Sequence, residues 1–158
     1  MKKFAVLVVL ATMCLGVYAQ QNKDVKLSET KNNVIIIKEP SYNGKVEHTF
    51  DLNFVGCYGD SKTNKVYLVV KVKDLESDKI YIGKTKAVTS KGKLYTSGCG
   101  DNRYDCIKDF DTEINLEKCA IEGVPTTVTD FADFQVSVKN ITCHFRNVPI
   151  QWDVKPEE

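Results

Sequence analysis

An acidic segment near the middle of the chain holds the side chains best suited to metal or acid–base chemistry. Its oxygen-bearing members are Asp101, Asn102, Asp105, Asp109 and Asp111. Hard cations such as calcium bind several carboxylate and carbonyl oxygens, which a flexible loop can supply. The spacing differs from that of an EF-hand loop, so the segment is a weak calcium candidate. Asp105, Asp109 and Asp111 are also candidate acid and base groups for a hydrolase.

Cysteines form the second group with potential chemistry. The sequence has six, and five lie beyond the N-terminal apolar run: Cys57, Cys99, Cys106, Cys119 and Cys143. The odd number predicts at least one free thiol or a link to another chain. Cys99 and Cys106 flank the acidic segment and are the first candidate disulfide; Cys57 and Cys119, each at the end of an apparent strand, are the second. The spacing leaves the connectivity open, and the absence of a C-x-x-C pair disfavours zinc.

The two histidines are weak candidates for catalysis. A nucleophile needs a base within hydrogen-bonding distance. Cys143 and His144 are neighbours, and neighbours on a strand point to opposite faces, so they are not expected to form a dyad. His48 has the inward phase of its strand and is expected to be partly buried. The sequence therefore predicts no catalytic residue and no cofactor.

The N-terminus has the layout of a secretory signal peptide. Two lysines precede an apolar run over 4–15, and small residues lead to Ala19, where cleavage is expected. A lipoprotein signal with Cys14 as the lipidated residue is disfavoured, because Met13 stands where Gly, Ala or Ser is required. The run is too short for a membrane span. We expect a signal at 1–19, export to the periplasm or medium, and no transmembrane segment in the mature protein.

Three segments are expected after the signal. Residues 20–32 are polar without periodicity and predict a flexible leader. Residues 33–154 are expected to form one folded domain, and 155–158 a short tail. The basic and acidic residues number 22 and 21, which leaves a net charge of +1. Because no block of like charge stands out, neither nucleic acid nor an anionic membrane is an expected partner.

Hydrophobic alternation predicts strands throughout the domain. Period-two patterns over 46–54 and 66–72 indicate two long strands that pair antiparallel. Shorter strands are expected at 80–82, 87–88 and 94–95, with turns between them. No segment has apolar residues at sustained helical spacing. We therefore predict an all-β, two-sheet antiparallel sandwich of about seven to nine strands, with a closed barrel as the alternative.

The alternation changes phase twice near the C-terminus. Its apolar positions shift between 134–138 and 141–145, and again before 148–152. Each shift predicts a turn or a bulge. Trp152 shares the phase of the last segment, which favours a core position over a sugar-stacking role.

Four segments resemble those of a protein family. They are 51–60 (DLNFVGCYGD), 65–70 (KVYLVV), 86–88 (KAV) and 146–152 (RNVPIQW). They are similar to elements of uncharacterised small exported immunoglobulin-like β-sandwich proteins of Gram-negative gut bacteria. The resemblance covers nearly the whole mature chain and implies an immunoglobulin-like fold and export. Its motifs are structural and imply no site, and 99–106 has no counterpart in them.

Two functions are compatible with these patterns. The first is an exported, non-enzymatic binding or interaction module that presents loops or an edge strand to an envelope protein or a surface glycan. The alternative is a secreted hydrolase of unfamiliar type that uses the loop carboxylates. Sandwich folds carry many functions, so the fold alone does not select a ligand.

Overall fold

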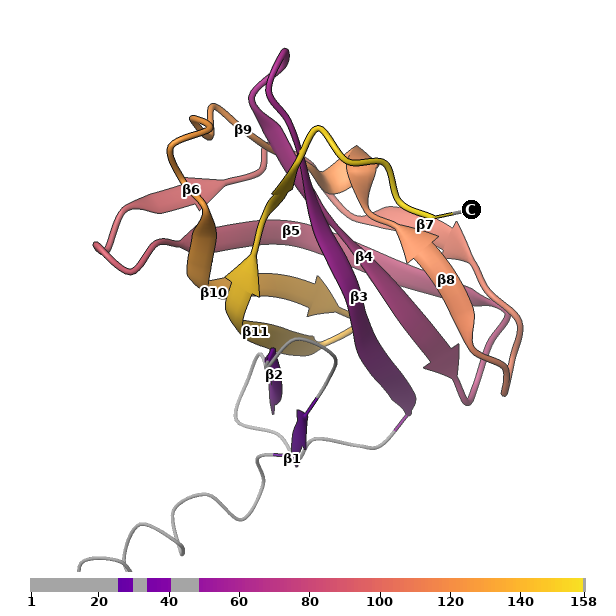
Figure 1. Ribbon diagram of the computed structural model, residues 1–158. Coiled ribbons are helices and arrows are strands. Elements are labelled where there is room, and N and C mark those ends of the chain that lie inside the picture. The colour runs from indigo at the N-terminus through magenta and orange to yellow at the C-terminus, as the bar shows by residue number, and fades with distance from the viewer. Residues whose placement is uncertain (1–25, 30–33, 41–48, 158) are drawn as a thin grey trace, which may run out of the picture.

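The computed structural model describes residues 26–29, 34–40 and 49–157, with side chains from residue 34 onward. The described residues form twelve strands and one short 3-10 turn, Glu117–Cys119. The strands build two sheets that pack face to face (Figure 1). The predicted all-β, two-sheet sandwich is thus confirmed. The described strands outnumber the seven to nine expected, because several are only two to four residues long.

The first sheet contains most of the antiparallel pairs. Its strand order is β1-β2-β11-β10-β5-β6. β7 also pairs with β5, along residues 79–82, whereas β6 pairs with residues 86–88 of the same strand. The bounds are β1 (Lys26–Glu29), β2 (Ile35–Pro40), β5 (Lys79–Val88), β6 (Leu94–Thr96), β7 (Asn102–Asp105), β10 (Asp130–Val138) and β11 (Ile141–Pro149).

The second sheet is smaller and is built on the two long strands that the alternation predicts. Its order is β12-β3-β4-β8, and β9 also pairs with β4. The bounds are β3 (Phe50–Asp60), β4 (Lys65–Asp74), β8 (Thr112–Asn115), β9 (Ile121–Glu122) and β12 (Gln151–Trp152). β3 and β4 are antiparallel with one irregularity between Phe54 and Gly56, as expected for an antiparallel hairpin, whereas β12 runs parallel to β3.

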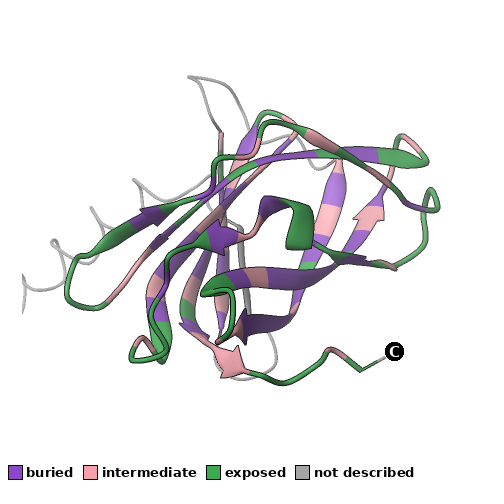
Figure 2. Ribbon diagram, turned by 90° about the horizontal axis from the view of Figure 1, so that it is seen from above, coloured by how far each residue is buried: buried purple, intermediate pink, exposed green. Residues whose placement is uncertain are grey.

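The core lies between the sheets and is filled by the inward-facing side chains of both (Figure 2). Alternate residues of β3 and β4 point into it because successive side chains on a strand face opposite sides. Its largest fully buried members are phenylalanines: Phe50, Phe131, Phe134 and Phe145. Each such side chain contributes about 1.5–3 kcal/mol through removal from water.

The two predicted phase changes coincide with unusual backbone. Lys139 has a φ of 53° in the turn between β10 and β11, and Asn147 has a φ of 58° within β11. Positive φ is uncommon outside glycine and marks a turn or a local break in a strand. The predicted turn at the first shift is confirmed, whereas at the second shift β11 has irregular backbone at Asn147 but keeps its register with β10.

Two segments differ from their predictions. Residues 80–88 were expected to be short strands separated near Gly83, but β5 continues through this glycine. A side chain at position 83 would collide with Oδ1 of Asp101, so the glycine permits close approach rather than a turn. In addition, β1 lies within the expected leader and pairs with β2; backbone pairing at a sheet edge requires no hydrophobic periodicity.

Several N-terminal predictions lie outside the described residues. These are the signal peptide at 1–19, the candidate lipidation site Cys14, most of the leader and His48. Within the described ranges, no helix is long and apolar enough to cross a membrane.

Candidate functional site

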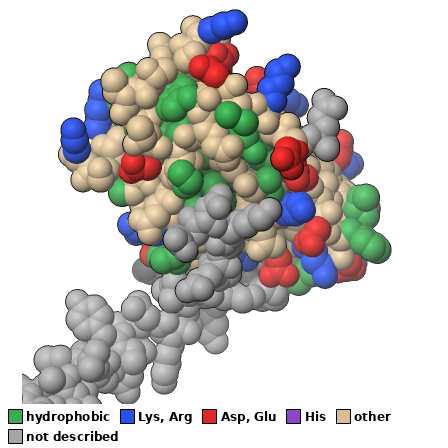
Figure 3. Space-filling model, in the orientation of Figure 1, with side chains coloured by type: hydrophobic (Ala, Val, Ile, Leu, Met, Phe, Trp, Pro, Cys, Tyr) green, Lys and Arg blue, Asp and Glu red, His purple; other side chains and the backbone are tan. Residues whose placement is uncertain are grey.

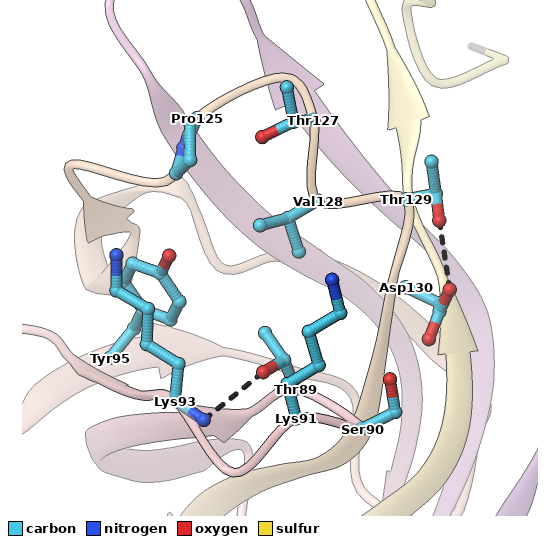
Figure 4. Close-up of a pocket in the computed structure, with 10 residues that line it drawn as sticks. All are labelled: Thr89, Ser90, Lys91, Lys93, Tyr95, Pro125, Thr127, Val128, Thr129 and Asp130. Carbon is cyan, nitrogen blue, oxygen red and sulfur yellow. Dashed lines mark hydrogen bonds between the residues drawn. The ribbon is translucent and has the colours of Figure 1, made fainter.

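A groove lies between two loops near the β6 side of the sandwich (Figure 4). One wall is the turn that joins β5 to β6, and the other is the loop that leads into β10. The groove has a volume of about 470 Å³. Its lining residues are Thr89, Ser90, Lys91, Lys93, Tyr95, Pro125, Thr127, Val128, Thr129 and Asp130. Concave sites with a few convergent polar groups are the usual form of a ligand-binding site.

The first wall is a tight turn closed by Thr89. The Thr89 amide donates to the carbonyl of Lys93 at 3.0 Å, and the Gly92 amide donates to the carbonyl of Thr89 at 2.9 Å. The Lys93 amide also donates to Oγ1 of Thr89, at 3.1 Å. Gly92 has a φ of 79°, which glycine adopts without steric cost. The turn holds two exposed lysines, Lys91 and Lys93, beside the groove.

The second wall is fixed by contacts from the C-terminal strands. The Val128 amide donates to the carbonyl of Pro125 at 2.9 Å, and the Ile150 amide donates to the carbonyl of Thr129 at 2.9 Å. The indole Nε1 of Trp152 donates to the carbonyl of Val128 at 2.9 Å. Trp152 is half-buried and packs against the core, close to the core position that its phase predicts. Trp152 therefore both packs against the core and anchors the loop that leads into β10.

Tyr95 forms the floor and links the groove to the core. Its side chain is 8% exposed, and its ring meets that of Phe131 edge-on at 6.2 Å. Nζ of Lys93 lies 4.9 Å from the centre of the same ring, within the range of a cation–π contact. The Tyr95 hydroxyl is buried and has no hydrogen-bond partner among the described residues. Leaving such a group unpaired costs about 1–3 kcal/mol.

The lining carries both signs of charge and many hydroxyl groups. Lys91 and Lys93 lie on one side of the groove, where Lys93 extends over Tyr95, and Asp130 lies on the other side next to Thr129 (Figure 4). Oγ1 of Thr129 donates to Oδ2 of Asp130 at 2.9 Å, which orients the carboxylate. A second hollow of about 250 Å³ shares Ser90 and Asp130 with the first. The two hollows together can accommodate an extended ligand.

The structure disperses the acidic residues that the sequence suggested for calcium or catalysis. Asp101 precedes β7, Asp105 ends it, and Asp109 and Asp111 follow in the loop to β8; all four are exposed. The Asp105 carboxylate lies 3.8 Å from the guanidinium of Arg103. Among the described residues, no group of three His, Cys, Asp or Glu side chains is placed to hold a metal ion. None of these aspartates lines either hollow.

Neither of the two disulfides that the sequence suggested is present. Each of the five cysteines in the described part has a free thiol. Cys99 and Cys106 lie beyond opposite ends of β7, an extended strand that holds them apart. Cys57 lies within β3 opposite Leu68, whereas the sulfur of Cys119 contacts the side chain of Asn102 beside β5. These placements correct both predicted pairings.

Cys143 and His144 point to opposite faces of β11, as expected. Cys143 is fully buried in the core, and burial raises the pKa of its thiol to about 12. His144 is on the outer face of the sheet, where Nδ1 lies 3.1 Å from Oδ2 of Asp133 and Nε2 lies 3.3 Å from Glu39. The hydrogen bond to Asp133 raises the pKa of His144, against the opposing effect of burial. This cluster is a structural ion pair and not a Cys–His dyad.

Sequence reasoning missed the groove. It identified Ser90-Lys91-Gly92 only as a turn, and it assigned no role to the loop that contains Thr127. The two walls are more than thirty positions apart in the chain, and the pairing of β5 with β10 brings them together. The available signals are the lysines and hydroxyl residues of the turn at 89–93 and the threonines of the loop at 125–130, and both are too common to identify a site.

Comparison with protein-family models and with curated proteins finds no match to this chain.

Proposed function

We propose that the protein is an exported, non-enzymatic binding module whose groove between the β5–β6 turn and the β10 loop binds an acidic surface glycan. The observation that carries this proposal is the groove lining. It combines two lysines with several hydroxyl-bearing side chains.

The chemistry of the lining favours a hydroxyl-rich, negatively charged ligand. Thr89, Ser90, Thr127 and Thr129 can each donate to or accept from a sugar hydroxyl. The ammonium groups of Lys91 and Lys93 can bind a carboxylate or sulfate, and hydrogen bonds to charged groups are the stronger ones. Outside the groove, basic and acidic side chains are interspersed on the face drawn in Figure 3. That face therefore has no broad region of one charge, and the attraction expected for an acidic ligand comes from Lys91 and Lys93 in the groove.

The arrangement of carboxylates supports binding rather than hydrolysis. Glycoside hydrolysis generally uses two carboxyl groups that flank the bond to be broken. Of the described residues that line the groove, Asp130 alone carries a carboxylate, and Thr129 donates to it.

A secreted hydrolase that uses Asp105, Asp109 and Asp111 is the weaker proposal, because these exposed side chains lie outside both hollows. Hydrolytic activity that is lost in an Asp109→Asn/Asp111→Asn variant would favour it over binding.

The test is titration of the purified protein with an oligogalacturonate, which carries a carboxylate on each sugar, and with a neutral maltooligosaccharide. We expect saturable binding of the acidic sugar that weakens as salt is added. Lys91→Ala/Lys93→Ala should weaken it about tenfold or more, the size of one lost charged contact. The matched control is Lys71→Ala/Lys84→Ala, which removes two exposed lysines outside both hollows.

Equal affinity of the two double variants would contradict a role for the groove lysines. Binding of neither sugar, together with a single recurrent envelope protein in cross-linking experiments on intact cells, would replace the glycan by a protein partner.

A further inference from the structure

Two thiols far apart in the sequence converge beside β5. Cys99 is half-buried in the loop between β6 and β7, and Cys119 is buried at the end of the 3-10 turn Glu117–Cys119. The two thiols are close enough for Cys99 to contribute, after burial, to the raised pKa of Cys119. Among the other described cysteines, none has a second thiol among the groups that shift its pKa.

Asn102 holds the two chain segments together. Its side-chain Nδ2 donates to the carbonyl of Gly100, the residue after Cys99, at 3.0 Å. The same Nδ2 lies 3.1 Å from Sγ of Cys119. One amide group therefore bridges the Cys99 loop and the sulfur of Cys119.

Thr85 makes a second, independent connection between the same segments. Its Oγ1 donates to the carbonyl of Cys119 at 2.7 Å, and its amide donates to Oγ of Ser97 at 3.0 Å. Oγ of Ser97 in turn lies 3.2 Å from Sγ of Cys99. Both cysteines are thus tied to the same residue of β5, Thr85.

We propose that Cys99 and Cys119 form an intramolecular disulfide in the exported protein. The oxidant is a second disulfide, carried by an oxidoreductase or by a small molecule. The thiolate of the more exposed Cys99 attacks that disulfide, which forms a mixed disulfide and releases one thiol. The Cys119 thiolate then attacks the sulfur of Cys99 and releases the second thiol. The two cysteines lose two protons and two electrons, and the oxidant gains them.

The other described cysteines have no such partner. Cys57 and Cys143 are fully buried in the core, where burial raises the pKa of both thiols and makes them poor nucleophiles. Cys106 lies beyond the far end of β7, where its thiol donates to the carbonyl of Ser77 at 3.5 Å. Burial and the contact with Cys99 raise the pKa of Cys119 to about 11, so uncatalysed oxidation should be slow at neutral pH and faster in mild base.

The bond would close a loop that passes through both sheets. The chain between Cys99 and Cys119 contributes β7 to the first sheet and β8 to the second. A disulfide that joins the two ends of this segment lowers the conformational entropy of the unfolded chain and so stabilises the folded protein. The inference does not depend on the groove or on the identity of its ligand.

Tryptic mapping tests the connectivity directly. Cleavage after lysine and arginine places Cys99, Cys106 and Cys119 in separate peptides, 94–103, 104–108 and 119–139. The purified full chain is incubated with oxidised glutathione in mild base, alkylated, digested without reduction and analysed by mass spectrometry. We expect peptide 94–103 linked to 119–139, lighter than their sum by two hydrogens. A product with Cys99 and Cys119 still alkylated, or with either linked to another cysteine, would overturn the proposal.

Thermal unfolding provides a second measurement. The oxidised protein should melt about 10 °C above the reduced protein, as expected for a cross-link of this loop length in a chain of this size. Cys99→Ser should abolish the difference, and Cys106→Ser, the control, should retain it. Because Cys99 is only half-buried, its variant is expected to fold even if Cys119→Ser does not. Retention of the difference in Cys99→Ser would refute the disulfide.

Discussion

At the scale of the residue, a buried aspartate depends on a single lysine. The Asp74 side chain is 0% exposed, and Nζ of Lys139 lies 3.1 Å from its Oδ2. Oδ1 of Asp74 accepts from the amides of Glu76 and Ser77 at 2.8 and 3.1 Å. Lys139 also pairs with Glu76, at 2.8 Å. The cluster connects the end of β4 to the turn between β10 and β11.

We expect Lys139→Met to destabilise the protein by about 3 kcal/mol, because it leaves the Asp74 carboxylate buried without its counter-charge while preserving the aliphatic stem. The measurement is the free energy of unfolding in urea. Lys71→Met, on an exposed position of β4, is the control and should change this value by less than about 0.5 kcal/mol. A loss in Lys139→Met no larger than that of the control would show that Asp74 is stabilised by its backbone hydrogen bonds alone.

The second residue-scale prediction concerns pH and His144. Asp133, followed by Glu39, favours the charged imidazole and raises the pKa of His144 above its ordinary value of 6.5. A raised folded-state pKa stabilises the protein fully below pH 6.5, and the stabilisation is lost as pH rises through the folded-state pKa. Burial opposes ionisation of Asp133, but hydrogen bonds from His144 and Gln135 outweigh it and lower its pKa below 3.8. That contribution is present above pH 3.8 and is lost as the pH falls through the lowered pKa.

Stability should therefore decline as pH rises above about 6.5, by about 1 kcal/mol, the order of one net hydrogen bond. Urea unfolding at a series of pH values measures this decline. His144→Gln should flatten it, and His48→Gln, which removes the other histidine, should preserve it. A decline that persists unchanged in His144→Gln would assign the pH dependence to another group.

At the scale of the element, β12 is positioned by the absence of a side chain on β3. A Cβ at Gly59 would collide with the six-membered part of the Trp152 indole. The Asp153 amide donates to the carbonyl of Gly59 at 2.7 Å, which fixes β12 beside β3. Because Trp152 also anchors the β10 loop through Val128, this contact supports one wall of the groove.

Gly59→Ala should displace the indole and destabilise the protein by about 1–3 kcal/mol, the range for overpacking. The chain has one tryptophan, so tryptophan fluorescence reports on the surroundings of Trp152. We expect the emission to shift to longer wavelength as the ring becomes more exposed. Gly98→Ala is the control, since a Cβ there meets nothing within 4 Å. An unchanged emission in Gly59→Ala would mean that β12 moves with the indole and retains its packing.

The strands differ in how far the sequence predicted them. β3 and β4 are long, and each has one buried face, so their alternation is unambiguous. β5 was divided in the prediction because glycine is common in turns, and the approach of Asp101 to Gly83 cannot be seen in the sequence. β1 carries no apolar alternation, and only its backbone pairing with β2 defines it as a strand.

At the scale of the whole molecule, the two sheets share one hydrophobic core. The core includes Phe54 from the second sheet, whose ring lies 6.2 Å from that of Phe145 in the first. Neither sheet can bury its apolar face without the other. The sheets are therefore expected to unfold together.

Urea unfolding should give coincident transitions by tryptophan fluorescence and far-ultraviolet circular dichroism, as expected for a single domain of this size. Fluorescence reports on Trp152 in the second sheet, and dichroism reports on the strands of both. The comparison should be made under reducing conditions, where no disulfide contributes. Separate midpoints for the two signals would show that the sheets unfold independently.

The sequence alone determined the all-β class and, for the long strands β3 and β4, which side chains face the core. Alternation is a local property: once a strand is extended, Cys143 and His144 must point to opposite faces whatever surrounds them. The lack of a helical stripe and the turns between alternating segments were likewise sufficient to predict an all-β sandwich.

Apart from the β3–β4 hairpin, only the tertiary structure decided which strands are neighbours, and the groove and the thiol pair depend on those pairings. The β5–β6 turn meets the loop before β10 because β5 pairs with β10, and Cys99 meets Cys119 beside β5. These pairings are stabilised by the burial of both sheets against each other, and that free energy depends on the whole core and not on any one segment. Distance along the chain carries little of that information, so the nearest cysteines in sequence, Cys99 and Cys106, are held apart while more distant ones converge.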